Sequence, residues 1–168
     1  MRTAPTLIVK KGDVIFAAPT EIRRAVDFAL ANGQDKAFTA AKPGEVMGYL
    51  AFGHPFLDGN GRAIMTVHAI MAQRAGFSID WSRTNKDDYL RALSRELDSP
   101  GKGILDAYLN PFIRDPVVYE KLAESIARAP GIDGSDVATN EVLGEANEPG
   151  VKAQYEAVVA KRKRSKDE

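Results

Sequence analysis

The sequence has no cysteine, no net charge and no long apolar run. Without cysteine there are no disulfides, thiolate metal sites or cysteine nucleophiles, and the chain suits a reducing compartment. Lys plus Arg number 23 and Asp plus Glu number 23, so no overall field would attract nucleic acid or an anionic membrane. The apolar run near the N-terminus is too short for a signal peptide, and no later run approaches membrane-spanning length. We therefore expect a soluble protein with no nucleic-acid or membrane partner.

The residues that are present predict a mainly α fold with one short β-hairpin. The chain has 168 residues, 44% of them apolar, which is enough for one well-packed core. Two β-rich runs around Gly12-Asp13 predict a hairpin over residues 6–16. Apolar residues at helical spacing predict helices from about residue 20 to a stop at Asn32-Gly33, then over 45–52, 62–75, 84–97, 104–112 and 117–129.

The C-terminal part of the chain differs in composition from the rest. Residues 131–150 are rich in Gly, Asp, Asn and Glu, which is typical of a linker, and a short amphipathic segment follows. The predicted organisation is a catalytic domain over 1–115, a trailing helix over 116–130, and a linker with a short helical tail over 131–168. The basic run at 161–164 is interpreted as a solvated tail.

The segment His-Pro-Phe-Leu-Asp-Gly-Asn-Gly-Arg, residues 54–62, lies between two predicted helices and has the residue types of a phosphate site. Gly59 and Gly61 flank Asn60, so backbone N–H groups can converge there without obstruction by Cβ atoms. The start of the following helix adds unpaired N–H donors and the positive end of a helix dipole. The sequence therefore predicts an anion cradle.

Three charged or titratable side chains and one aromatic side chain complete this segment. Asp58 offers a hard carboxylate of the kind that binds Mg²⁺ together with substrate phosphates. Arg62 offers forked, permanently charged donors to a phosphate, and His54 has a pKa suited to accepting a proton from a hydroxyl. Phe56 is expected to point into the core and anchor the loop.

The segment resembles the signature of the Fic family, whose pattern is HPFx(D/E)GNGR, and the wider resemblance covers residues 6–115. It implies a Fic-type helical bundle with a β-hairpin flap, and an enzyme that transfers AMP from Mg-ATP to a Tyr, Thr or Ser hydroxyl of a target protein. By position, His54 matches the general base and Asp58 the magnesium ligand. Gly59, Asn60 and Gly61 match the phosphate cradle, and Arg62 matches the phosphate-binding arginine.

The hairpin around Lys10, Lys11 and Gly12 resembles the family's flap, which holds the target segment by strand-like pairing. An alternative is that the two lysines only solubilise an exposed hairpin edge. On the motif helix, His68 lies six residues after Arg62, and the expected role for it is a core or surface position rather than a catalytic one.

Two features depart from the family's longer pattern. A second arginine that grips the distal phosphates is replaced by Met65, and no Ser or Thr is followed four residues later by the glutamate of an inhibitory helix. We expect no built-in inhibition of that type, while a separate antitoxin protein stays open. Transfer of UMP, a phosphoryl group or phosphocholine, and a catalytically silent nucleotide- or partner-binding scaffold, are the alternatives. The resemblance fits a bacterial cytoplasmic toxin or an effector secreted into a host cell.

Overall fold

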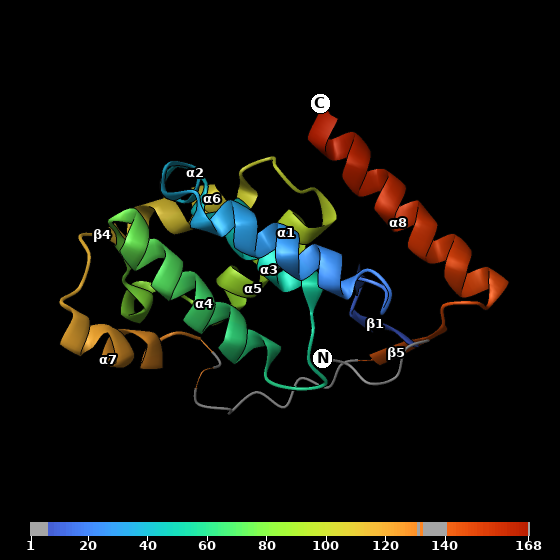
Figure 1. The fold of residues 1–168 in the computed structure, drawn as a ribbon, viewed down its shortest axis with the longest axis horizontal. Helices are drawn as coiled ribbons and strands as arrows, with labels where there is room; N and C mark the ends of the chain where they lie inside the picture. Colours follow the sequence, from blue (N-terminus) through green and yellow to red (C-terminus); the bar gives the residue numbers. More distant parts are fainter. Residues whose placement is uncertain (1–6, 131, 133–140, 168) are drawn as a thin grey trace.

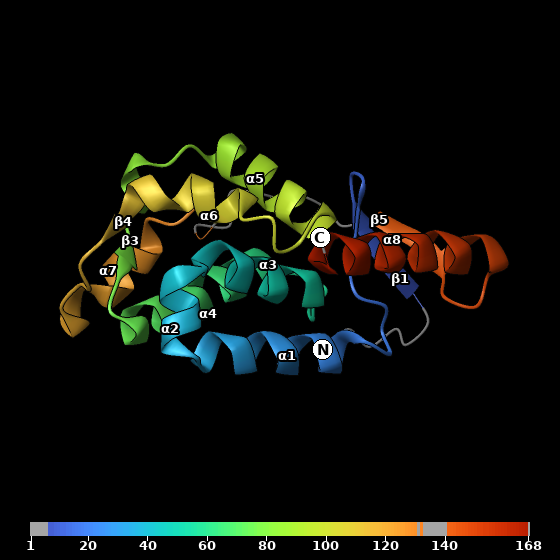
Figure 2. The ribbon, with the colours of Figure 1, turned by 90° about the horizontal axis from the view of Figure 1, so that it is seen from above.

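The computed structural model describes residues 7–130, 132 and 141–167. The protein is mainly helical with a small antiparallel sheet at one end, which confirms the predicted fold class (Figure 1). Helix α3 (Pro43–Gly53) lies between α1 (Ile22–Gln34) on one side and the pair α5 (Lys86–Asp98) and α6 (Ile104–Leu109) on the other (Figure 2). The core is therefore built around α3.

Helix α3 is buried on nearly all sides because it combines apolar residues with small ones. Val46 and Met47 are fully buried. A Cβ atom at Gly44 would lie 2.3 Å from the backbone nitrogen of Asp106, and one at Gly48 would lie 2.9 Å from Cγ of Glu96. These glycines allow α5 and α6 to approach the α3 backbone directly, so the packing around α3 depends on their lack of side chains.

Buried carboxylates bind the N-terminal ends of the central helices. Asp106 accepts a hydrogen bond of 2.7 Å from the N–H of Gly44, in the first turn of α3. Glu96 accepts bonds from the N–H groups of Gly101, at 3.0 Å, and Leu105, at 3.2 Å. Each carboxylate satisfies N–H groups that lack helical partners. Asp106 lies 62 positions from Gly44, so a local sequence pattern does not reveal that cap.

The region after α1 differs from the prediction. Helix α1 continues through Asn32-Gly33 to Gln34, and a short unpredicted helix α2 (Lys36–Ala41) follows. A Cβ atom at Gly33 would lie 2.2 Å from Sδ of Met71. Gly33 therefore serves close packing against α4 (Asn60–Ala75) rather than helix termination.

The two later helices are shorter than predicted. Helix α6 stops at Leu109 and continues as the 3-10 turn η2 (Asn110–Phe112), because proline at 111 cannot donate a helical hydrogen bond. Between residues 117 and 129 the structure has the turn η3 (Tyr119–Lys121) and helix α7 (Leu122–Ala127). Two small elements were not predicted, the strands β3 (Ser78–Ile79) and β4 (Ile113–Arg114), which pair with each other. The turn η1 (Trp81–Arg83) leads into α5.

The predicted hairpin is formed by β1 (Leu7–Lys11) and β2 (Val14–Ile15), while its first predicted residue, Thr6, lies outside the described residues. A third strand, β5 (Glu141–Glu145), pairs antiparallel with the other edge of β1. This strand lies within the range predicted as linker, of which 131 and 133–140 are outside the described residues. The domain boundaries at 115 and 130 stay a prediction.

The C-terminal helix α8 (Pro149–Asp167) corresponds to the predicted helical tail but is longer, and it lies beside the sheet and the end of α3 (Figures 1 and 2). The interpretation of residues 161–164 as a solvated tail is wrong for Arg162, which is only partly exposed. Lys161 pairs with Asp98, and Arg162 donates to the carbonyl of Leu97. Among the described residues, none of the helices has the length and apolar character needed to cross a membrane.

Candidate active site

His54 lies at the C-terminal end of α3, where the chain leaves the helix. Its backbone has φ 41° and ψ 55°, the left-handed conformation. Among the described residues other than glycine, His54 alone has positive φ. Pro55 follows and prevents the helix from continuing. Positive φ is uncommon for residues other than glycine and is concentrated at functional positions. The helix end therefore fixes where the imidazole projects.

The imidazole of His54 is buried, with 7% of the residue exposed. It stacks on the ring of Phe16, with ring centroids 3.7 Å apart and planes 16° apart. Phe16 directly follows β2, and the next residue, Ala17, donates a 3.0 Å hydrogen bond to the carbonyl of Phe52. Phe16 and Ala17, which directly follow the hairpin, thus fix the position of the His54 imidazole. The sequence does not predict this role of Phe16, and the one signal for it is an aromatic residue directly after the hairpin.

Asn60 braces the loop between α3 and α4. Its side-chain oxygen accepts from the N–H of Phe56 at 3.0 Å, and its side-chain nitrogen donates to the carbonyl of the same residue at 2.8 Å. Asn60 is buried, whereas the side chain of Phe56 is exposed at 41%, so the prediction that Phe56 anchors the loop in the core is wrong. Because Asn60 satisfies both backbone groups of residue 56, the loop is held through its main chain.

The loop ends at the N-terminus of α4. Gly59 has φ 78° and caps the helix, and its carbonyl accepts the first helical hydrogen bond, from the N–H of Ala63 at 3.0 Å. The N–H groups of residues 60–62 therefore precede the helical bonding pattern. A Cβ atom at Gly61 would have no atom within 4 Å. Open space next to these donors suits a bound anion.

Asp58 and Arg62 flank this helix start. Nη2 of Arg62 lies 3.3 Å from Oδ2 of Asp58, with the side chains 45% and 91% exposed. A hydrogen bond from the N–H of Gly59, followed by the Arg62 guanidinium, lowers the pKa of the Asp58 carboxyl below its ordinary value. Asp58 is therefore ionised at neutral pH.

A single ionised carboxylate next to a phosphate cradle is the kind of donor set with which proteins hold Mg²⁺, the substrate phosphates supplying further oxygens. Among the described residues, no group of three or more His, Asp or Glu side chains forms a metal site made by the protein alone. The residues present thus fit a magnesium ion that arrives with a nucleotide.

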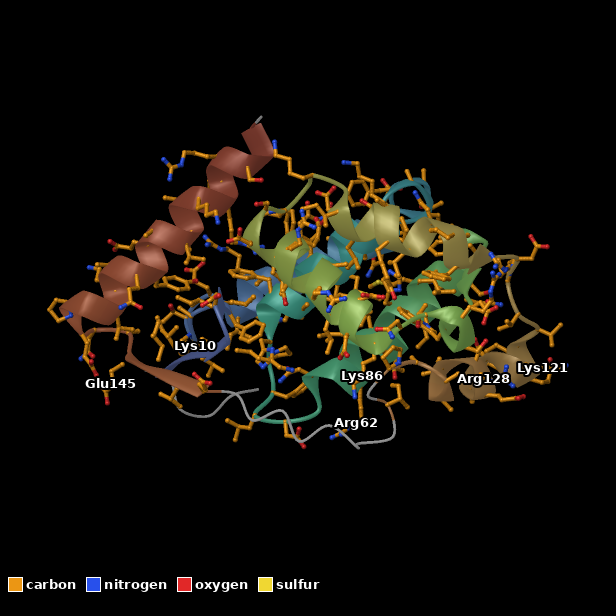
Figure 3. All side chains as sticks on the ribbon, turned by 180° about the vertical axis from the view of Figure 1, so that it is seen from behind. Lys10, Arg62, Lys86, Lys121, Arg128 and Glu145 are labelled. Atoms are coloured by element: carbon orange, nitrogen blue, oxygen red, sulfur yellow. The ribbon has the colours of Figure 1, made fainter. Side chains whose placement is uncertain are left out.

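The residues of the predicted flap lie at the tip of the hairpin. The ammonium of Lys10 pairs with Glu141 of β5 at 3.0 Å, so this lysine bridges two strands within the molecule. Lys11 is exposed, and Gly12 takes φ 56° in the turn. Figure 3 shows Lys10 on the strands near α8 and Arg62 projecting outward from the start of α4. The hairpin reaches the loop through Phe16 and His54.

Two residues of α4 that follow Arg62 belong to the core, as expected for His68. Met65 is 3% exposed and lies in the main hydrophobic cluster, so position 65 faces the interior rather than the loop. His68 is 1% exposed, and its Nε2 lies 2.7 Å from the carbonyl oxygen of Pro43. The imidazole of His68 therefore serves as a buried hydrogen-bonding group between α4 and α3.

Burial lowers the pKa of His68 from 6.5 to about 4. Between these values the unfolded chain binds a proton that the folded protein excludes, so the free energy of unfolding should fall by ~3 kcal/mol as the pH drops from about 6.5 to 4. Urea unfolding at several pH values measures this. In His68→Gln, an amide N–H can still donate to the Pro43 carbonyl, but the side chain does not titrate. The variant should therefore show a flatter dependence of unfolding free energy on pH in this range. An unchanged slope would mean that His68 is not the titrating group.

Comparisons with known proteins bear on this site. No family model matches the chain. It is 37% identical over 60 residues to the protein adenylyltransferase VbhT of Bartonella schoenbuchensis, a match that covers 36% of this chain and 13% of that protein. The chain thus matches a small part of its relative. The name of that relative describes an enzyme that transfers an adenylyl group to protein.

Proposed function

We propose that the protein transfers AMP from Mg-ATP to a Tyr, Thr or Ser hydroxyl of a target protein. The arrangement of the loop between α3 and α4 is the observation that carries the proposal. One short segment presents the imidazole of His54 at a helix end and open N–H donors at the next helix start, with Asp58 and Arg62 beside them. A base, an anion cradle and a metal-binding carboxylate are the groups that nucleotidyl transfer requires.

In the proposed reaction, the target hydroxyl attacks the α-phosphorus of ATP. The new bond joins the hydroxyl oxygen to phosphorus, the bond from phosphorus to the bridging oxygen breaks, and pyrophosphate leaves. An imidazole nitrogen of His54 takes the hydroxyl proton, which suits its ordinary role as a general base. Stacking on the ring of Phe16 favours one orientation of the His54 imidazole. The protein therefore acts mainly by positioning and charge stabilisation.

The phosphate groups would lie at the start of α4. The backbone N–H groups of residues 60–62 and the guanidinium of Arg62 would bind their oxygens. Asp58 would hold Mg²⁺, and the ion would supply positive charge next to the phosphate oxygens. Position 65, where the family's longer pattern has a second arginine, is a buried methionine. Arg62, whose side chain is 45% exposed, is therefore the arginine of this motif that could reach the phosphates.

Radiolabelled ATP tests the proposal directly. Purified protein is incubated with Mg²⁺, a cell lysate, and ATP labelled at either the α- or the γ-phosphate. Relative to lysate without the protein, we expect additional protein-bound label from α-labelled ATP and no additional label from γ-labelled ATP, with an adenylyl adduct in peptide mass spectrometry. Label from the γ-position would indicate phosphoryl transfer instead. Saturable ATP binding without any adduct would favour a catalytically silent scaffold.

Asp58→Asn removes the proposed metal ligand while leaving the size of the side chain unchanged. We expect the Mg²⁺ concentration for half-maximal transfer to rise ~10-fold or more, which corresponds to about 1.4 kcal/mol. Stability should be unaffected because the side chain is 91% exposed. Asp87→Asn, on an exposed residue in the first turn of α5, is the matched control. Equal magnesium dependence of both variants would exclude Asp58 as the ligand.

A further inference from the structure

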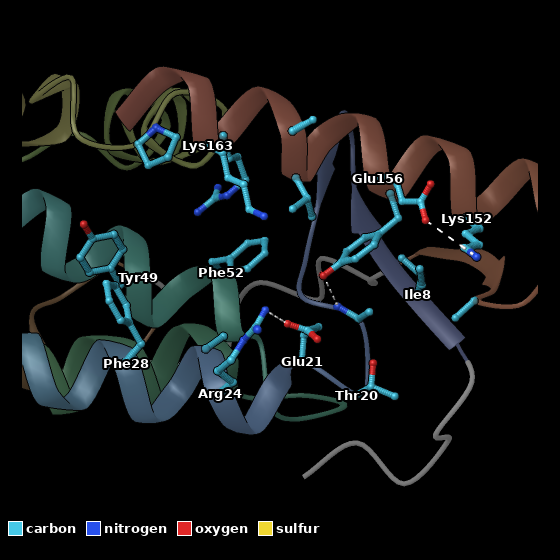
Figure 4. Close-up of a pocket in the computed structure, with 18 residues that line it drawn as sticks. Ile8, Thr20, Glu21, Arg24, Phe28, Tyr49, Phe52, Lys152, Glu156 and Lys163 are labelled. Atoms are coloured by element: carbon cyan, nitrogen blue, oxygen red, sulfur yellow. Dashed lines mark hydrogen bonds and ion pairs between the residues drawn. The ribbon is translucent and has the colours of Figure 1, made fainter. Parts of the chain in front are cut away.

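A cavity of about 780 Å³ lies between α8 and the body of the protein, away from the loop of residues 54–62 (Figure 4). Helix α8 forms one wall, while α1 and the end of α3 form the other. Its volume is in the range of small-molecule sites in proteins. Most of its lining is apolar, and the residues concerned include Ile8, Ala18, Phe28, Tyr49, Phe52 and Val159.

Cationic side chains outnumber carboxylates in the lining of the cavity. Four cationic side chains line it, namely Arg24, Lys152, Arg162 and Lys163, against two carboxylates, Glu21 and Glu156. Arg24 is paired with Glu21, and Nζ of Lys152 lies 3.9 Å from Oε1 of Glu156. Both carboxylates are therefore engaged by two of the cations. The positive charge that remains at the cavity comes from two adjacent residues of α8.

Arg162 is the more buried of these two cations. Its guanidinium carbon lies 4.0 Å from the centre of the Phe52 ring, and it donates to the carbonyl of Leu97. Burial lowers the pKa of Arg162 to about 10. Among the described residues, no carboxylate lies within ion-pair distance of Arg162, while the charges of Glu96 and Asp98 raise its pKa from further away, against the lowering by burial.

Lys163 extends from α8 on the same side, toward Phe52 (Figure 4). An anionic group placed between Arg162 and Lys163 would lie next to two cationic side chains at one end of the cavity. The apolar floor formed by Phe28, Tyr49 and Phe52 would then accommodate an uncharged body. This combination selects for an elongated molecule with one charged end.

We propose that this cavity binds an anionic amphiphile, a molecule with a carboxylate or phosphate head and an apolar chain. The head contacts Arg162 and Lys163, and the chain lies along the aromatic floor. The cavity also borders the segment that holds His54, because the N–H of Ala18 donates a 3.0 Å hydrogen bond to the hydroxyl of Tyr155 on α8. The site is separate from the loop of residues 54–62, so it does not depend on the proposed AMP transfer.

Calorimetry with monomeric dodecanoate and dodecyl phosphate, each below its critical micelle concentration, tests the proposal without any assay of activity. We expect saturable binding at one site and at least tenfold weaker binding of the neutral dodecyl maltoside. Lys163→Glu should weaken binding of both anions at least tenfold, whereas Arg164→Glu should not, because Arg164 is exposed and does not line the cavity. Equal loss in the two variants, or equal affinity for the neutral detergent, would overturn the proposal.

A second pair of variants tests the volume rather than the charge. Ala160 is exposed and lines the cavity, so Ala160→Trp should narrow it and weaken binding at least tenfold, while Ala157→Trp, on an exposed position of α8 that does not line the cavity, should leave binding unchanged. Full binding by Ala160→Trp would overturn the proposal. So would binding of anionic phosphatidylglycerol vesicles without binding of either monomeric probe, since that result would indicate attraction to a lipid surface.

Discussion

His54→Asn is expected to reduce the proposed transfer of AMP to protein by ~10²-fold to 10⁴-fold while leaving the protein folded. Asparagine tolerates the left-handed backbone that residue 54 adopts, so the substitution adds little strain. It lacks a group that can accept the hydroxyl proton near neutral pH. Label transfer from α-labelled ATP measures the loss, and urea unfolding shows that the fold is retained.

Phe16→Leu is the control for this experiment. It removes the aromatic ring on which His54 stacks, while the imidazole itself is still present. We expect a smaller loss of transfer, on the order of tenfold, because the base is less well oriented rather than absent. Transfer by His54→Asn at the level of the unmodified protein would mean that another group accepts the proton. The proposed role of His54 would then be abandoned.

Gly44→Ala is expected to lower the free energy of unfolding by about 3 kcal/mol or more. The added Cβ would lie 2.3 Å from the backbone nitrogen of Asp106 and 2.5 Å from the carbonyl carbon of Leu105. Backbone atoms of a packed helix cannot rotate away as a flexible side chain can, so α3 and α6 must separate. The displacement would also lengthen the hydrogen bond from the Gly44 N–H to Asp106. Chemical denaturation measures the change.

Gly61→Ala is the matched control because the added Cβ would have no atom within 4 Å. The same substitution in the first turn of α4 should leave stability unchanged or raise it by up to ~1 kcal/mol. If residues 60–62 bind phosphates, however, this variant should lose ATP affinity ~10-fold or more. Similar stability losses in both variants would contradict the close packing at Gly44, and unchanged ATP affinity in Gly61→Ala would contradict the cradle.

The sequence predicted the local features of the candidate site because they depend on neighbouring residues. Pro55 ends α3 and leaves His54 at the helix end, and Gly59 begins α4 with a left-handed backbone. Periodicity likewise predicted most helices and the hairpin. It could not separate Gly33 inside a helix from a helix stop, because only contact with Met71 explains why glycine is required there.

Contacts between distant segments account for what the sequence did not reveal. Phe16 contacts His54 across 38 positions of chain only because the hairpin folds back on α3. Strand β5 pairs with β1, and Arg162 packs on Phe52, although their own segments resemble a linker and a solvated tail. Short-range patterns carry no information about such partners.

By itself, the sequence determined a mainly helical protein with a hairpin and one glycine-rich loop carrying His54, Asp58 and Arg62, because helix periods, turn residues and local charges act over a few residues. The tertiary structure alone decided that Phe56 is exposed, that His68 lies against the carbonyl of Pro43, and that α8 encloses a cavity against α1 and α3. Burial and charge balance depend on which surfaces meet after folding, and that is settled by packing of the whole chain.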